Sequence, residues 1–268
     1  MVFANTPPLH LSDTFVLIVT ETPSEPPNLI LKSLTSNKII KLTDFPNPQP
    51  ALLGVKKELI KYKRDDGVEL WADLYLPANY ENGKKLPLLC WAYPLEFKNK
   101  EHASQVKTSP ARFIQTNWSR PTLWLARGWA VLDNFSVPIV GVGDNEPNDT
   151  FIEQVISSAN AAITECVQRG VCDPERVAVG GHSYGAYLTA HLLAHTRLFK
   201  GGIGRSGAYN RTLTPFSYQS EERTFWQAPQ MYLQNSPFTH ADKIEAPLLL
   251  IHGTVSLYDF YSQTNYCR

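Results

Sequence analysis

The run Gly180-Gly181-His182-Ser183-Tyr184-Gly185 constrains this chain more than any other feature, because of what flanks it. The preceding Arg176 to Val179 segment is a short β-run, and the following Ala186 to Leu193 segment has the composition of a helix. The pattern predicts a sharp strand-to-helix turn with Ser183 in strained backbone geometry. Glycine is expected at positions 181 and 185, because side chains there would collide with neighbouring backbone.

The chain around this turn alternates strand and helix patterns. Leu86 to Trp91 and Trp129 to Leu132 are compact apolar runs, and Phe151 to Arg169 carries apolar residues at helical spacing up to Gly170. Such alternation predicts a mostly parallel sheet covered by helices on both faces. With the turn at Ser183, it indicates an α/β-hydrolase fold in which that serine is the nucleophile.

The first fifty residues follow a different pattern. Short β-runs at Phe15 to Val19, Asn28 to Lys32 and Lys38 to Leu42 predict an antiparallel meander, and the proline-rich Phe45 to Pro50 segment suits a stiff linker. We therefore expect a domain boundary near residue 53, with an N-terminal β piece at 1–53 and the hydrolase domain at 54–268. Within the latter, the Asp66-Gly67 step predicts a hairpin.

Composition excludes several classes of function. Lys plus Arg and Asp plus Glu both number 25, so no net charge would draw the chain to nucleic acid or to an anionic membrane. The sequence contains no apolar run of about 18 residues, as a membrane span requires, and no recognisable signal segment. A soluble, cytoplasmic protein is expected by default, with an organelle left open. The four cysteines are read as reduced thiols, and no metal or cofactor motif is present.

Two groups are candidates for binding an oxyanion in a reaction at Ser183. The backbone N–H of Tyr184 directly follows the nucleophile, at the start of a helix. The hydroxyl of Tyr93 is the second candidate, because Tyr93 follows the strand expected at Leu86 to Cys90; the alternative is a buried aromatic side chain. His182 is adjacent to Ser183, but neighbours on a tight turn point apart, so it is expected to pack or orient rather than to act as base.

Three segments together resemble the prolyl oligopeptidase family of serine peptidases, and most closely its glutamyl endopeptidase branch. They are Gly180 to Ala186, Gly204 to Pro215 and Pro247 to Gly253. The resemblance implies a β-propeller followed by an α/β-hydrolase domain, so that residues 1–53 would be the last propeller strands. It also implies peptide substrates, an acyl-enzyme on Ser183 and an oxyanion contact from Tyr93.

The same resemblance places two arginines beside the substrate pocket. Arg205 and Arg211 would bind the carboxylate of a Glu residue preceding the scissile bond, because a guanidinium fork can contact both carboxylate oxygens. The alternative for either arginine is a structural ion pair.

The chain departs from the family where the other members of the triad are expected. Ser256 stands where the acid should be, Asp259 is out of register, and no histidine follows His252. The chain as given is therefore expected to be an inactive, incomplete copy of a peptidase with an exposed apolar sheet edge. Two other readings stay open: a generic esterase or acyl-peptide hydrolase, and a peptide-binding pseudoenzyme. The sequence does not indicate an oligomeric state.

Overall fold

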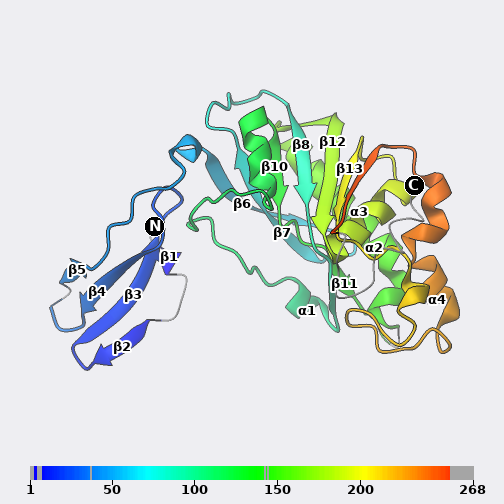
Figure 1. Ribbon diagram of the computed structural model, residues 1–268, viewed down its shortest axis with the longest axis horizontal. Coiled ribbons are helices and arrows are strands. Elements are labelled where there is room, and N and C mark those ends of the chain that lie inside the picture. Colours follow the sequence, from blue (N-terminus) through cyan, green and yellow to red (C-terminus); the bar gives the residue numbers. More distant parts are fainter. Residues whose placement is uncertain (1–2, 5–7, 37, 142, 144, 254–268) are drawn as a thin grey trace.

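Three β-sheets and four α-helices make up the part of the chain that this computed structural model describes, residues 3–4, 8–36, 38–141, 143 and 145–253 (Figure 1). The smallest sheet pairs β9 (Leu95–Phe97) with β11 (Pro138–Val140) in parallel. Short 3-10 helices connect the larger elements: η1 (Pro50–Leu52), η2 (Pro121–Arg127), η3 (Pro147–Thr150), η4 (Arg211–Leu213) and η5 (Pro237–Lys243).

A five-stranded antiparallel sheet occupies the N-terminal part of the chain and lies to one side of the main body (Figure 1). β3 is central in this sheet: β4 pairs with one of its edges, β1 and β2 pair with the other, and β5 pairs with β4. The predicted meander is therefore confirmed. The strands are β1 (Phe3–Ala4), β2 (Leu9–Ser12), β3 (Phe15–Glu21), β4 (Asn28–Ser33) and β5 (Ile39–Lys41).

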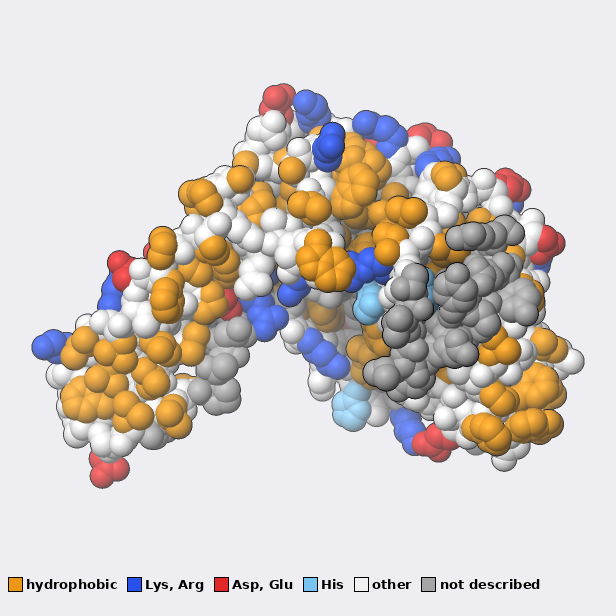
Figure 2. All heavy atoms as spheres, in the orientation of Figure 1, with side chains coloured by type: hydrophobic (Ala, Val, Ile, Leu, Met, Phe, Trp, Pro, Cys, Tyr) orange, Lys and Arg blue, Asp and Glu red, His pale blue; other side chains and the backbone are white. Residues whose placement is uncertain are grey.

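This small sheet carries many exposed apolar side chains. Apolar atoms gather over it in the space-filling view (Figure 2), and Leu9 and Ile39 are 60% and 57% exposed. Soluble monomers rarely expose large contiguous apolar patches, so such a surface usually packs against other protein. The exposed residues are Leu9, Leu11, Phe15, Leu34, Ile39, Ile40 and Leu42.

A seven-stranded sheet in the order β14-β13-β12-β8-β10-β7-β6 forms the main body. The strands from β14 to β10 run parallel, whereas β7 and β6 are antiparallel to their neighbours. This arrangement confirms the predicted α/β-hydrolase fold. The strands are β6 (Lys56–Lys63), β7 (Glu69–Leu76), β8 (Leu86–Trp91), β10 (Ala130–Asp133), β12 (Cys172–His182), β13 (Gly202–Arg205) and β14 (Leu248–Ile251).

Helices cover both faces of this sheet. The main core joins Leu74, Cys90 and Leu132 of the sheet to α2 (Phe151–Gln168) and α3 (Tyr184–His195) on one face. The intervening residues of the same strands point the other way, where Tyr75 and Val131 pack with Leu125 of η2. The remaining helices, α1 (Lys100–Ala103) and α4 (Pro229–Gln234), are short.

Two predicted turns and one predicted edge are found where the sequence indicated them. Gly67, with a φ of 86°, lies in the hairpin between β6 and β7, and Gly170, with a φ of 73°, follows the end of α2. Within the described part of the chain β14 pairs with β13 alone, and its Leu249 and Ile251 are 57% and 44% exposed. This exposure agrees with the expected apolar sheet edge.

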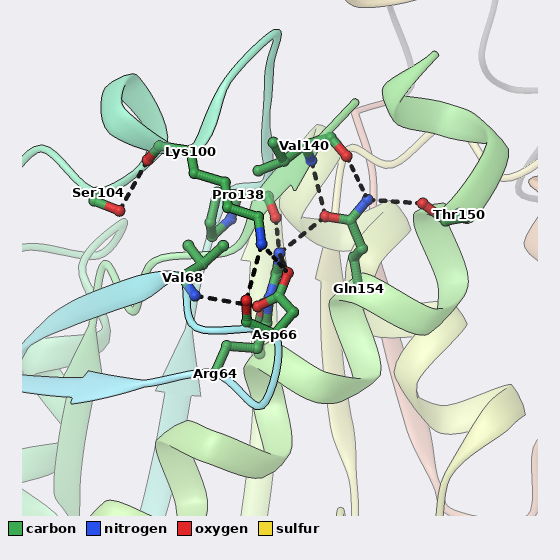
Figure 3. Close-up of polar contacts among 10 residues, drawn as sticks. Arg64, Asp66, Val68, Lys100, Ser104, Pro138, Val140, Thr150 and Gln154 are labelled. Atoms are coloured by element: carbon green, nitrogen blue, oxygen red, sulfur yellow. Dashed lines mark hydrogen bonds and ion pairs between the residues drawn. The ribbon is translucent and has the colours of Figure 1, made fainter. Parts of the chain in front are cut away.

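A buried guanidinium ties the β6–β7 turn to β11 and α2 (Figure 3). Arg64 is 2% exposed and donates to both carboxylate oxygens of Asp66, at 2.9 and 2.8 Å. Its Nη1 donates to Pro138 O at 2.8 Å and to Ser158 Oγ at 3.1 Å, and the Nη2 that contacts Asp66 also donates to Gln154 Oε1 at 3.0 Å. Gln154 in turn exchanges hydrogen bonds with both backbone groups of Val140. The network therefore fixes the position of β11.

Candidate active site

The turn at Ser183 has the geometry that the sequence predicts. β12 ends at His182, α3 begins at Tyr184, and Ser183 between them has φ 57° and ψ −114°, a conformation that L-residues rarely adopt. The Ser183 N–H donates to Arg205 O at 2.8 Å, which holds the turn against the end of β13. The half-buried Ser183 side chain therefore stands at the carboxyl edge of the sheet.

Close backbone packing explains the two glycines of the turn. A Cβ atom at position 181 would lie 2.4 Å from the carbonyl carbon of Gly185, and one at position 185 would lie 2.1 Å from Ala92 O. Neither contact can be relieved by a side-chain rotation, because the opposing atoms are backbone. The Ala92 contact also fixes the distance between the nucleophile turn and the loop that carries Tyr93.

Strained backbone conformations gather at this edge of the molecule. Asn134, Ser183 and Ser206 all have positive φ, and each directly follows a parallel strand, β10, β12 and β13 respectively. Gln219, the fourth described non-glycine residue with positive φ, is hydrogen-bonded to Tyr93. Such strain costs about 1 to 3 kcal/mol per residue and concentrates at functional sites. Its distribution marks this edge as the candidate active site.

The two residues proposed to supply the oxyanion donors contact each other through their rings. The rings of Tyr93 and Tyr184 contact edge to face, with centroids 5.8 Å apart. Tyr93 is 44% exposed rather than buried, and its hydroxyl lies 3.4 Å from Gln219 Oε1. Tyr184 begins α3, where backbone N–H groups have no intrahelical partner, and its own hydroxyl donates to Glu96 Oε1 at 2.7 Å. This second contact anchors the start of the helix to β9.

The two arginines occupy different environments. The half-buried Arg205 has its guanidinium 5.0 Å from the Trp118 ring centroid and 6.0 Å from that of Trp91, and it donates to Ser119 O. Arg211 is only 4% exposed and is enclosed by the rings of Tyr184, Tyr187 and Tyr218 at 4.1 to 5.4 Å. Of the two, Arg205 is therefore the one that an approaching ligand reaches directly.

The described residues do not include a base for Ser183. His182 is exposed, and its pKa is lowered by partial burial and by the nearby Arg205 charge. His191 and His195 lie on α3 with their rings stacked, and His240 on η5 contacts the His195 ring edge to face. In the described ranges no histidine nitrogen is hydrogen-bonded to Ser183 Oγ. Ser256 and Asp259, the two positions considered for the acid, lie outside those ranges.

A buried charge cluster lies on the η2 face of the sheet, away from the nucleophile. Lys57 Nζ is 3.8 Å from Asp73 Oδ2, and Asp133 is the direct cross-strand neighbour of Asp73. Burial raises the pKa of Asp133 to about 6, against an opposing effect of Arg120 and a reinforcing one of Asp73. Asp133 therefore stays protonated in the folded chain between about pH 4 and pH 6, where a free Asp carboxyl is already ionised.

We expect Asp133→Asn to stabilise the protein at pH 8. The pKa of Asp133 is higher in the folded than in the unfolded chain, so the ionised carboxylate lowers the free energy of unfolding at high pH. This penalty disappears as the pH falls through about 6 toward 4. The free energy of unfolding of the variant should exceed that of the parent protein by about 3 kcal/mol at pH 8 and should equal it near pH 4. Urea unfolding at both pH values measures this, with exposed Asp65→Asn as control. A loss of stability at pH 8 would contradict the assignment.

No group of His, Cys, Asp and Glu side chains within the described residues is arranged to hold a metal ion. Cys90, Cys166 and Cys172 are buried free thiols, and burial raises the pKa of each; Cys267 lies outside the described ranges. None of the described helices is both long and apolar enough to cross a membrane.

The fold defines an α/β-hydrolase with a strained strand-to-helix turn at Ser183. Residues 151–255 match the prolyl oligopeptidase family. The chain is 50% identical over 248 residues to a rice protein (Oryza sativa subsp. japonica) named "Probable glutamyl endopeptidase, chloroplastic", and 49% identical to the Arabidopsis thaliana protein of the same name. These matches identify a prolyl oligopeptidase family domain in the chain, which is similar to the glutamyl endopeptidases, and they confirm the predicted resemblance.

These relatives are much longer than the chain. Each alignment covers 91% of this chain but 26% of the relative. Solved structures show the same fold: a Mycobacterium tuberculosis puromycin-hydrolyzing peptidase aligns with a TM-score of 0.69 at 19% identity, over 98% of this chain and 42% of the other. Porphyromonas gingivalis dipeptidyl peptidase 4 aligns with a TM-score of 0.68 at 18% identity, over 97% and 37%.

Sequence reasoning missed three residues that border the site. Trp118 is 84% exposed and stacks on Arg205, Gln219 contacts Tyr93, and Glu96 accepts from Tyr184. Trp118 and Gln219 lie in irregular segments, and nothing in their local sequence links them to Ser183. Glu96 follows Tyr93 by three residues, so the same loop signal could have included it.

Proposed function

We propose that this chain carries the nucleophile half of a serine peptidase that cleaves peptides through an acyl-enzyme on Ser183. The observation that carries the proposal is the strained conformation of Ser183 in the turn between β12 and α3. Ser183 Oγ would attack the scissile carbonyl, and the Tyr184 N–H and Tyr93 hydroxyl would stabilise the resulting oxyanion. The amine half of the peptide then leaves, and water hydrolyses the ester.

The proton balance of this reaction requires a base that accepts the Ser183 hydroxyl proton and returns it to the leaving amine. None of the described histidines is hydrogen-bonded to Ser183, and we propose that Ser183 is a weak nucleophile unless such a base is supplied. We propose residues 1–53 as the last strands of a β-propeller and residues 54–268 as the hydrolase domain. The exposed apolar surface of the N-terminal sheet supports this division, because neighbouring blades would cover it.

Arg205 supports a preference for Glu before the scissile bond. Its guanidinium lies beyond the end of β13, one strand from Ser183, and none of the ion pairs among the described residues involves it. The rings of Trp118 and Trp91, whose centroids lie 5.0 and 6.0 Å from the guanidinium carbon, would orient this planar group. Arg211 would act on the substrate indirectly, because its buried guanidinium contacts the ring of Tyr184.

A fluorophosphonate probe tests the nucleophile, because labelling requires an activated serine. We expect the 268-residue chain to label at least a hundredfold more slowly than the full-length rice relative. Ser183→Ala should remove any labelling. Rapid labelling of the chain at Ser183 would show that a base is present after all. No labelling, together with binding of unmodified peptides, would favour a peptide-binding pseudoenzyme.

A further inference from the structure

A small apolar pocket opens beside Tyr93, on the side of the site away from Arg205. It is open to solvent and has a volume of about 160 Å³. Its walls come from β7, from β9 and from the segment that follows β10. The apolar residues that form these walls are Trp71, Leu95, Phe97, Phe135 and Val137.

The size and lining of this pocket match a single apolar side chain. An apolar protein cavity of about 150 Å³ is known to bind benzene, so the present pocket can hold an aromatic ring or a branched aliphatic group. The polar residues that line it are Gln105, Lys107, Asn134 and Ser136. Lys107 is exposed, with its ammonium 5.4 Å from the Phe97 ring centroid. A negatively charged side chain would lose hydration inside, and the exposed Lys107 ammonium offers it only a partner that solvent screens.

The pocket is held open by the rigid network around Arg64. Pro138, the first residue of β11, lines the pocket and accepts a hydrogen bond from the buried Arg64 guanidinium (Figure 3). Trp71 is held by its own N–H groups: its backbone N–H donates to Ser136 Oγ at 2.9 Å and its Nε1 donates to Gln105 O at 3.1 Å. Binding would therefore require little rearrangement.

The strand order fixes where the pocket lies relative to the nucleophile. Arg205 ends β13, Ser183 follows β12, Tyr93 follows β8 and Asn134 follows β10, and these strands are consecutive neighbours in the sheet. A peptide whose carbonyl lies between Ser183 and Tyr93, with its acidic side chain at Arg205, continues past the scissile bond toward β10. The pocket lies on that side, since Asn134 lines it together with Tyr93.

We propose that this pocket binds the side chain of the residue that follows the scissile bond, and that it selects aromatic and branched aliphatic side chains there. The proposal rests on the proposed peptidase function. It assigns a second specificity element, independent of Arg205, to the leaving-group half of the substrate.

Fluorescence anisotropy with the Ser183→Ala protein measures this preference without turnover. The peptides Ala-Ala-Glu-Xaa-Ala-Lys(fluorescein) would carry Phe, Leu, Ala or Asp at Xaa. We expect the Phe and Leu peptides to bind about tenfold more tightly than the Ala and Asp peptides. Moving Phe to the residue before Glu should abolish the advantage. An advantage that appears only at that earlier position would overturn the proposal.

Two matched surface variants test whether the pocket is the reason that the Phe and Leu peptides bind more tightly. Leu95→Glu places a charge at the pocket, where Leu95 is 44% exposed, whereas Leu123→Glu makes the same change at a 52% exposed leucine on η2. We expect Leu95→Glu to reduce the Phe-to-Ala binding ratio to about one and Leu123→Glu to leave it unchanged. Equal ratios in the two variants would overturn the proposal.

A small probe separates this inference from the peptidase function itself. N-acetyl-4-fluorophenylalanine amide, followed by fluorine NMR, should bind the chain and be weakened at least fivefold by Leu95→Glu but not by Leu123→Glu. That result supports the pocket as a binding site for apolar side chains. If the probe binds in this way but peptides do not bind, only the proposed peptidase function is contradicted. Absence of probe binding at millimolar concentration would overturn the pocket assignment.

Discussion

Gly185→Ala should destabilise this protein by more than about 4 kcal/mol, in the range reserved for severe core or backbone disruption. The new Cβ would lie 2.1 Å from Ala92 O, so the start of α3 and the end of β8 must move apart. The same movement separates Tyr184 from Tyr93 and should abolish reaction at Ser183 in any active full-length protein. Urea unfolding followed by circular dichroism measures the loss.

Gly201→Ala is the matched control for that substitution. Gly201 stands just before β13, and a Cβ there would meet Pro247 O at 3.5 Å, an ordinary contact distance. We expect a change within about 1 kcal/mol, because only the ordinary glycine-to-alanine effects remain. If both variants lose stability equally, close backbone approach at position 185 is not the reason for its glycine.

Arg64→Met should cost about 3 kcal/mol of folding free energy. Methionine retains much of the apolar stem but removes the donor that Arg64 supplies to Pro138 O and Ser158 Oγ, inside a region where Arg64 itself is 2% exposed. Each buried acceptor without a partner costs about 1 to 3 kcal/mol. Thermal and urea unfolding of the variant measure the effect.

The neighbouring Lys63→Met substitution removes a cation of similar length from an exposed position on β6. We expect it to change stability by less than about 0.5 kcal/mol. Arg64→Met should also weaken binding of the fluorinated probe, because β11 loses its anchor. Equal stability of the two variants would show that the buried network contributes nothing beyond the loss of a charge.

The sequence alone determined the parts of this molecule that depend on neighbours along the chain. The turn at Ser183, its two glycines, the hairpin at Gly67 and the helix α2 were all predicted, because hydrophobic spacing and backbone sterics act over a few residues. The same local patterns were sufficient to indicate the α/β-hydrolase fold. Three short segments of the sequence likewise carry the resemblance to the family.

Only the tertiary structure decided which side chains surround Ser183. Arg205 and Arg211 lie six residues apart in one segment, yet one reaches the surface between two tryptophans and the other is enclosed by three tyrosine rings. The Tyr93 contact with Gln219 joins residues 126 positions apart, and the apolar pocket is assembled from three separate segments. Such contacts depend on how strands are ordered and how loops pack over their ends, which no local pattern encodes.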